Sequence, residues 1–153
     1  MEIVEFKTSE VEQVFEKEKA KLIKIFPNIQ IEHIGGTSVP GLITKGDLDI
    51  NIRVQKDDFP TVVEKLKSIY QINQPENWTE TYASFKDTID GIDFGAQVTA
   101  VDSPEDYFLK HRDFLRTHPE VVEKFNQLKK KWEGKDMAEY RKEKSEFFEK
   151  LTS

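Results

Sequence analysis

The sequence predicts an α+β fold, in which a mixed β-sheet is flanked by helices and followed by a helical C-terminal segment. Two patterns indicate this class. Apolar residues recur at helical spacing near the N-terminus and through the last third of the chain, and four segments between them alternate apolar and polar residues as strands do. A length of 153 residues is enough for one domain with a substantial core. We therefore expect residues 1–153 to form a single domain.

The first half of the chain contains two predicted helices and two predicted strands. Ser9-Glu10-Val11-Glu12 has the form of a capping box, and apolar residues then repeat at helical spacing until Pro27. Short strands are expected at residues 29–34 and 47–54. Asp57-Asp58-Phe59-Pro60 opens the second helix, whose apolar positions continue to residue 69.

The second half contains two strands and three helices. Residues 79–86 and 92–101 are predicted to pair around a turn at residues 87–91. A helix is expected to start at Ser103, because Pro104 then occupies its first turn. Pro119 is expected to start the next helix, which runs through Trp132. Gly134 then breaks the pattern before a last helix at about residues 135–151.

Two acids one residue apart are the most informative feature of the second predicted strand. Side chains alternate across a strand, so Asp47 and Asp49 should point to one face while Leu48 and Ile50 fill a core on the other. Neighbouring carboxylates repel, and burying them requires a counter-charge. Mg²⁺ commonly provides it, bound by one or two carboxylates together with substrate phosphates. The pair therefore predicts a magnesium site, and the alternative is that both are ordinary surface acids at a strand end.

A turn rich in glycine and hydroxyl residues precedes this strand. Gly35, Gly36, Thr37 and Ser38 can present backbone N–H groups and hydroxyls to a phosphate. The alternative is turn chemistry alone, which glycine and proline at these positions already require. The two interpretations are compatible.

These motifs resemble known families. Ile34-Gly35-Gly36 followed by Asp47-Leu48-Asp49-Ile50 resembles the signature of the nucleotidyltransferase superfamily. Residues 32–42, residues 111–120, and Tyr140 with Lys144 on the last predicted helix together resemble the GrpB-like family. That resemblance covers most of the chain and implies a nucleotidyltransferase-like fold. Members of this family are sometimes fused to dephospho-CoA kinase.

The chain departs from the family pattern at several positions. Gly36 stands where the family often has Ser, and Gly46 where it often has Pro. The family often has an apolar residue at the position of Asp47, so its acid maps onto Asp49, and the metal pair can also be read as Asp49 with Asn51. Gln97 lies near a position where the family often carries histidine.

Three further residues are candidates for the same site. Asp93 is the best candidate for a third, catalytic carboxylate, since alternation places it on one face with Gly95 and Gln97; the alternative is a polar residue beside a hairpin turn. Lys45 is predicted to hold a phosphate as a point charge, against the alternative of a lone surface lysine. Arg112 is predicted to contact phosphate through its guanidinium, against the alternative that it pairs with an acid inside the protein.

Composition restricts the classes of function. The chain has no Cys, which excludes disulfides, thiolate metal sites and cysteine nucleophiles. No apolar run approaches the roughly 20 residues that span a bilayer, and the first residues lack the pattern of a signal peptide, so we expect no membrane contact and a cytoplasmic location. The net charge of −6 argues against nonspecific nucleic-acid binding.

We expect a Mg²⁺-dependent nucleotidyltransferase that acts on a nucleoside triphosphate and an unidentified acceptor. Asp47 and Asp49 would hold the metal, and Asp93 would deprotonate the acceptor hydroxyl. The first alternative is a non-catalytic module of the same fold that binds a nucleotide, CoA or another phosphorylated small molecule. The second is a protein-interaction domain that uses the helical C-terminal half. The sequence gives no information on oligomeric state.

Overall fold

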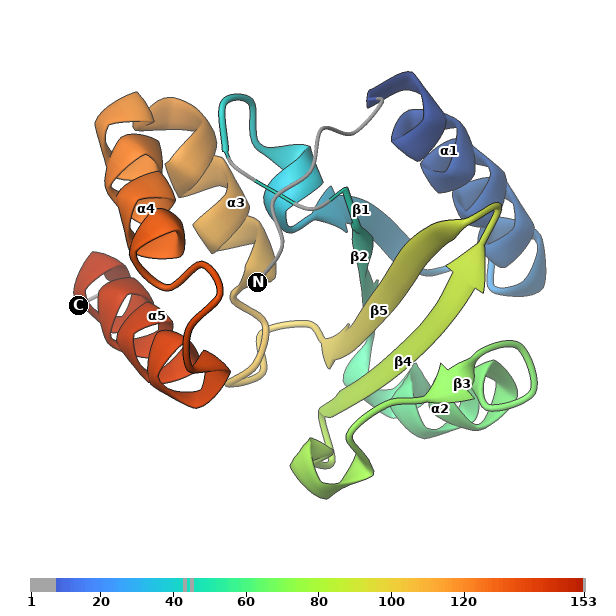
Figure 1. Cartoon of the computed structure of the whole chain (residues 1–153). Coiled ribbons are helices and arrows are strands. Elements are labelled where there is room, and N and C mark those ends of the chain that lie inside the picture. Colours follow the sequence, from blue (N-terminus) through green and yellow to red (C-terminus); the bar gives the residue numbers. More distant parts are fainter. Residues whose placement is uncertain (1–7, 43, 45, 153) are drawn as a thin grey trace.

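A five-stranded mixed sheet forms the centre of the computed structural model, which describes residues 8–42, 44 and 46–152 (Figure 1). The strands lie in the order β1-β2-β5-β4-β3. Their bounds are β1 Gln30–Ile34, β2 Leu48–Val54, β3 Gln71–Ile72, β4 Tyr82–Ile89 and β5 Ile92–Ala100. Among the described strands, β2 pairs with β5 in parallel, and the other three pairs are antiparallel.

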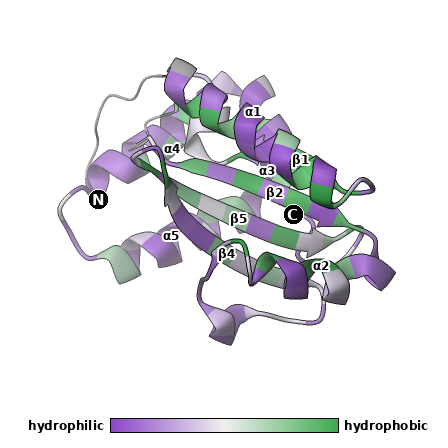
Figure 2. Cartoon of the chain, turned by 90° about the vertical axis from the view of Figure 1, so that its right-hand side faces the viewer, coloured by the Kyte–Doolittle hydropathy of each residue, from purple (hydrophilic) through white to green (hydrophobic). Residues whose placement is uncertain are grey.

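Hydrophobic and hydrophilic residues are interspersed along the strands of the sheet (Figure 2), and the alternation along β2 places them on different faces. Leu48, Ile50 and Ile52 point to the side of α1 (Thr8–Ile25) and α2 (Phe59–Leu66), where they join the main hydrophobic core. The opposite face carries Asp49 and Asn51. The predicted place of Asp49 on the face opposite the core residues is therefore confirmed, whereas Asp47, which was predicted to share the strand, directly precedes it.

The hairpin between β4 and β5 is tighter than the sequence suggested. Its strands extend through Ile89 and from Ile92, so that only Asp90 and Gly91 form the turn. Both turn residues have positive φ, at 52° and 79°. Two-residue hairpin turns with this conformation match the natural twist of the strands, and Asp-Gly is a favoured sequence for them.

The first C-terminal helix begins later than predicted. We expected it at Ser103, but α3 spans Phe108–Thr117. Residues 102–107 form turns in which Asp106 accepts hydrogen bonds from the backbone N–H of Asp102 and from two nitrogens of Arg53 on β2. Because the Asp106 carboxylate is fixed to the sheet, the segment turns there before the helix starts.

Three helices form a lobe on the polar side of the sheet. After α3 come α4 (Pro119–Lys131) and α5 (Met137–Thr152), separated by Gly134 at a φ of 72°. A second apolar cluster, distinct from the main core, joins Leu115, Phe125 and Tyr140 of the lobe to Val39 and Leu42, which follow β1. No helix within residues 8–42, 44 and 46–152 is both long and apolar enough to cross a membrane.

Candidate functional site

The glycine turn leads from β1 toward β2 and is held by its own hydroxyl groups. Gly35 has a φ of 76°, and residues Gly36–Ser38 form a short 3-10 helix. The Ser38 hydroxyl donates to the Gly35 carbonyl oxygen at 2.6 Å, and the Thr37 hydroxyl donates to the Asp47 carbonyl oxygen at 2.9 Å. Both side chains are buried, so the hydroxyl groups predicted to meet a phosphate serve the turn in this structure.

The Asp49 carboxylate lies between two glycines. A Cβ atom added to Gly35 would approach Asp49 Oδ2 to 2.6 Å, and one added to Gly95 on the neighbouring strand would approach Asp49 Oδ1 to 2.7 Å. Real Cβ atoms do not come so close to an oxygen. The missing side chains at Gly35 and Gly95 therefore make the space in which this carboxylate sits.

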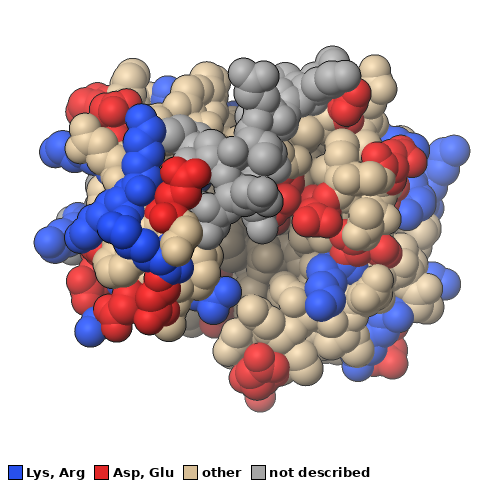
Figure 3. Space-filling view, in the orientation of Figure 1, with Lys and Arg blue, Asp and Glu red and all other residues tan. Residues whose placement is uncertain are grey.

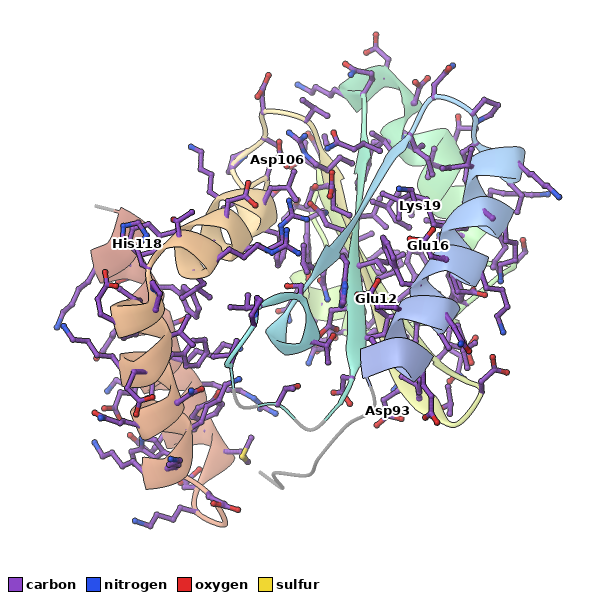
Figure 4. The ribbon with its side chains drawn as sticks, turned by 90° about the horizontal axis from the view of Figure 1, so that it is seen from above. Glu12, Glu16, Lys19, Asp93, Asp106 and His118 are labelled. Atoms are coloured by element: carbon purple, nitrogen blue, oxygen red, sulfur yellow. The ribbon has the colours of Figure 1, made fainter. Side chains whose placement is uncertain are left out.

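Asp47 and Asp93 lie at one end of the central strand pair. Each directly precedes the first residue pair of the parallel ladder, Leu48 with Phe94, and Asp93 shares a face of β5 with Gly95 as expected. Asp93 is exposed and only two residues beyond the hairpin turn, at the end of the sheet opposite Asp106 (Figure 4). Within the described part of the chain, no group of three or more carboxylates or histidines is arranged to hold a metal ion.

Two lysines of the helical lobe face Asp49. Lys129 on α4 is 8% exposed, and its ammonium lies 4.6 Å from the centre of the Phe125 ring. The pKa of Lys129 is lowered to about 8, mainly by burial and also by the neighbouring Lys144, while the carboxylate of Asp49 acts in the opposite direction. A Cβ atom added to Gly36 would lie 3.7 Å from the Lys129 ammonium, which brings this lysine against the glycine turn.

Lys144 on α5 completes this group of charges. Lys144 is an exposed residue, but loss of water around its ammonium lowers its pKa, while the Asp49 carboxylate favours the charged form. The ammonium lies 5.9 Å from the Phe125 ring, the same ring that Lys129 approaches. Between the helical lobe and strands β4 and β5 the surface is hollowed (Figure 3). Asp49, Lys129 and Lys144 therefore form a charged cluster between sheet and lobe.

The two arginines of α3 hold the lobe to the sheet. Arg112 donates to Glu32 at 2.8 Å, to the His33 carbonyl oxygen at 3.1 Å and to Asp113. Arg116 donates from Nε to the Ser38 carbonyl oxygen at 2.9 Å. Arg112 thus has the internal acid partners that the alternative interpretation anticipated, and its predicted contact with phosphate stays a prediction.

Asn51, the alternative partner of Asp49, is fully buried. Its amide nitrogen donates to the Gln97 carbonyl oxygen and the Thr99 hydroxyl, which ties β2 to β5. Within the part of the chain that the structure describes, its amide oxygen has no hydrogen-bond partner. The position of Asn51 favours a structural role, while Asp49 keeps its place beside the glycine turn.

Sequence reasoning missed Lys129. The run Lys129-Lys130-Lys131 is only a weak indication of nucleic-acid binding in an acidic chain, and no ligand role was predicted for it. Lys129, however, follows Phe125 by one helical turn and so lies on the apolar face of its helix. That spacing was the available signal. Lys45, which was predicted to bind phosphate, lies outside the described residues.

Comparison with known sequences gives a family match over the whole chain. A model of the family described as GrpB protein matches residues 1–153. A UPF0157 protein of Vibrio cholerae is 31% identical over 140 residues, which are 92% of this chain and 74% of that protein. A UPF0157 protein of Halalkalibacterium halodurans is 28% identical over 126 residues, which are 78% of this chain and 63% of that protein.

Solved structures share the fold. The crystal structure of conserved protein GrpB from Enterococcus faecalis superimposes with a TM-score of 0.71 at 21% identity, covering 99% of this chain and 100% of that one. A structure of Cid1 poly(U) polymerase bound to MgATP gives a TM-score of 0.54 at 12% identity, over 79% of this chain and 39% of the polymerase. The sheet and helices are therefore nucleotidyltransferase-like, and these likenesses show the fold alone.

Proposed function

Because this chain belongs to the GrpB protein family and has a nucleotidyltransferase-like fold, we propose that it binds a nucleoside triphosphate together with Mg²⁺ and transfers the nucleotidyl group to an acceptor. In this reaction an acceptor oxygen forms a bond to the α-phosphorus and pyrophosphate leaves. The structure described as Cid1 bound to MgATP supports the choice of ligand class.

The cluster of Asp49 with two lysines is the observation that carries this proposal. Without ligand, the carboxylate and the ammonium groups stabilise one another across the gap between sheet and lobe. A magnesium–triphosphate ligand offers each of them a partner of opposite charge, since carboxylate oxygens suit Mg²⁺ and ammonium groups suit phosphate oxygens. Lys129 and Lys144 would hold the phosphates beside the glycine turn.

The predicted carboxylate pair provides the donors for the metal. Asp47 and Asp49 carry the oxygen atoms that Mg²⁺ prefers, and Asp49 sits in a space that glycines keep open. When bound, the metal would neutralise the charge that develops on the phosphates. Asp93, on the same face of β5 as Gly95, is the proposed base for the acceptor hydroxyl.

A second function, nucleotide binding without transfer, is favoured by one observation. Among the described residues, the three acids do not form a group arranged to hold a metal, and Asp93 is exposed near the hairpin turn. A binding module needs Asp49, the glycine turn and the lysines, but it does not need Asp93.

Calorimetry and a turnover assay test both functions. Binding of a nonhydrolysable ATP analogue with Mg²⁺ should weaken by at least about tenfold in Asp49→Asn, because the variant loses the negative charge that would hold the metal. A tenfold loss corresponds to about 1.4 kcal/mol of binding free energy. Gly95→Ala should weaken binding similarly, because its Cβ would displace the Asp49 carboxylate. Equal binding by wild type and Asp49→Asn would remove Asp49 from the site.

Turnover separates the two functions. Incubation with labelled nucleoside triphosphates and candidate acceptors should release pyrophosphate in the wild type and not in Asp93→Asn, if transfer takes place. Nucleotide binding without pyrophosphate release, unchanged by Asp93→Asn, would support the binding module instead.

A further inference from the structure

A buried histidine connects the glycine turn to the first helix. His33 on β1 is 7% exposed, and its ring stacks on Phe15 of α1 with ring centres 5.3 Å apart. Its Nε2 lies 2.8 Å from the Thr37 hydroxyl oxygen, and its Nδ1 lies 3.3 Å from a carboxylate oxygen of Glu12. Glu12 extends from α1 toward the strands (Figure 4).

The positions of the protons in this series of contacts, from Glu12 through His33 to Thr37, follow from counting donors. The Thr37 hydroxyl has one proton and donates it to the Asp47 carbonyl oxygen, which can only accept. The Thr37 oxygen is then an acceptor toward His33, so His33 Nε2 carries a proton. Ionised Glu12 is also only an acceptor, so its contact with Nδ1 is favourable when that nitrogen is protonated too.

Three charged groups surround the ring. Burial lowers the pKa of His33, Glu12 raises it, and Arg116 and Arg112 of α3 lower it. The proton on Nε2 does not depend on this balance, because the neutral ring can also carry its single proton there. The hydrogen bond to Thr37 is therefore available in both charge states.

We propose that His33 is a positioning residue: its Nε2–H holds Thr37 so that the Thr37 hydroxyl fixes the backbone of Asp47 against the glycine turn. This inference rests on the proposed function, because Asp47 is one of the two proposed metal ligands. This series of contacts leads from the α1 side of the sheet to the site, through Glu12, His33, Thr37 and Asp47. Through it, the placement of a metal ligand depends on a residue that touches neither metal nor nucleotide.

Two substitutions at His33 distinguish the effect of its Nε2–H donor from the effect of losing the ring. In His33→Gln the amide nitrogen can occupy the place of Nε2, whereas in His33→Asn it can occupy only the place of Nδ1. Both variants lose the aromatic contact with Phe15, so each serves as the control for the other. Thr37→Val removes the hydroxyl at nearly constant volume, and Thr37→Ser keeps it.

Amide hydrogen exchange in the turn gives a measurement independent of activity. The N–H groups of Ser38 and Val39, which donate to the carbonyls of Gly35 and Gly36, report on the turn. Exchange should be faster by on the order of fivefold in His33→Asn and Thr37→Val than in His33→Gln and Thr37→Ser, the effect of one hydrogen bond. The double variant His33→Asn with Thr37→Val should exchange no faster than either single variant. Equal exchange in His33→Asn and His33→Gln would overturn the inference.

Metal–nucleotide affinity, measured in parallel by calorimetry with Mg²⁺ and the nonhydrolysable ATP analogue, should follow the same order. An affinity that follows only the thermal midpoints, rather than the presence of the donor, would also overturn the positioning role. If wild type binds no nucleotide, the proposed function fails, and the exchange order still decides whether His33 positions the turn.

Discussion

Lys129 shows how a single side chain acquires its chemistry from its surroundings. It is 8% exposed, lies over the Phe125 ring and faces Asp49, and its pKa falls to about 8 mainly because of burial. An exposed lysine remains charged well beyond that pH. The positive charge of Lys129, and with it the attraction of this residue for an anion, therefore decreases as the pH rises through about 8.

This pKa gives a prediction for ligand binding. The ammonium form binds phosphate, so affinity for the magnesium–nucleotide should be highest below about pH 8 and fall by up to about tenfold per pH unit above it. Lys129→Arg keeps its charge throughout, so its affinity should decline less than that of the wild type between about pH 7 and about pH 9.5, and any decline that remains reports on Lys144, whose pKa is also lowered. Calorimetry across this range, with a check of thermal stability at each pH, provides the measurement. A parallel decline in both proteins would show that titration of Lys129 does not cause the loss of affinity.

The sequence predicted some residues of the candidate site and not others. The place of Asp49 followed from alternation along β2, and the turn at Gly35 and Gly36 followed from glycine chemistry. Lys129 lies 80 residues after Asp49, and no local pattern states which helical lysine will fold over a given acid. Local sequence patterns do not predict which side chains tertiary packing brings together in the site.

At the scale of elements, one ion pair connects the start of the helical lobe to the sheet. Arg53 donates from Nε and Nη2 to the two oxygens of Asp106 at 2.8 and 2.7 Å, and the Asp106 side chain is 5% exposed. These hydrogen bonds hold the pKa of Asp106 below its ordinary value of 3.8. The stabilisation is present above that value and is lost as the pH falls through the lower pKa of the folded state.

Asp106→Asn should therefore destabilise the protein in a pH-dependent way. At neutral pH we expect the free energy of unfolding to fall by about 2 to 4 kcal/mol, because Arg53 loses a largely buried charged partner. The difference from wild type should shrink below about pH 3.8 as the wild-type carboxyl becomes protonated. Urea unfolding at several pH values measures this, with the exposed Asp102→Asn as a control. A difference that persists unchanged in acid would contradict the assigned role of the charge.

The same ion pair explains the main error in the predicted elements. Pro104 at a first-turn position is compatible with a helix start, and the sequence around it contains no signal of a distant arginine. The contact with Arg53 holds residues 102–107 in turns and delays α3 to Phe108. Four of the strands and the other helices were predicted to within a few residues because their apolar periodicity is local, whereas the two-residue strand β3 (Gln71–Ile72) is too short to show such a pattern and was not predicted.

At the scale of the whole molecule, the described residues form two separate apolar clusters. The main core lies under α1 and α2, and the second lies around Phe125 of the lobe, whose ring meets Phe147 and Phe148. The second cluster also takes in Val39 and Leu42, which follow the glycine turn, and Arg112 and Arg116 add polar contacts to Glu32 and Ser38. Two separate cores favour partial opening of the lobe while the sheet stays closed.

Phe125→Ala should reveal this division. Removing a buried phenylalanine commonly costs about 3 to 5 kcal/mol, and this cost should fall on the lobe. Amide hydrogen exchange should accelerate in α4 and α5 while β2 and β5 remain protected. Val98→Ala, a smaller change in the main core, should instead lower protection in the sheet. Equal acceleration in both regions for Phe125→Ala would indicate that the chain opens as one unit.

The parallel pairing of β2 with β5 also bears on the order of folding. The β4–β5 hairpin closes through a two-residue turn and can form within microseconds, whereas Ile50 must find Ala96, which is 46 residues later in the chain. Only that late step brings Asp49 to Gly95. We therefore expect a newly made chain to form its hairpin before its charged cluster, so that a population trapped before β2 docks on β5 would show β-structure by spectroscopy without any affinity for ligand.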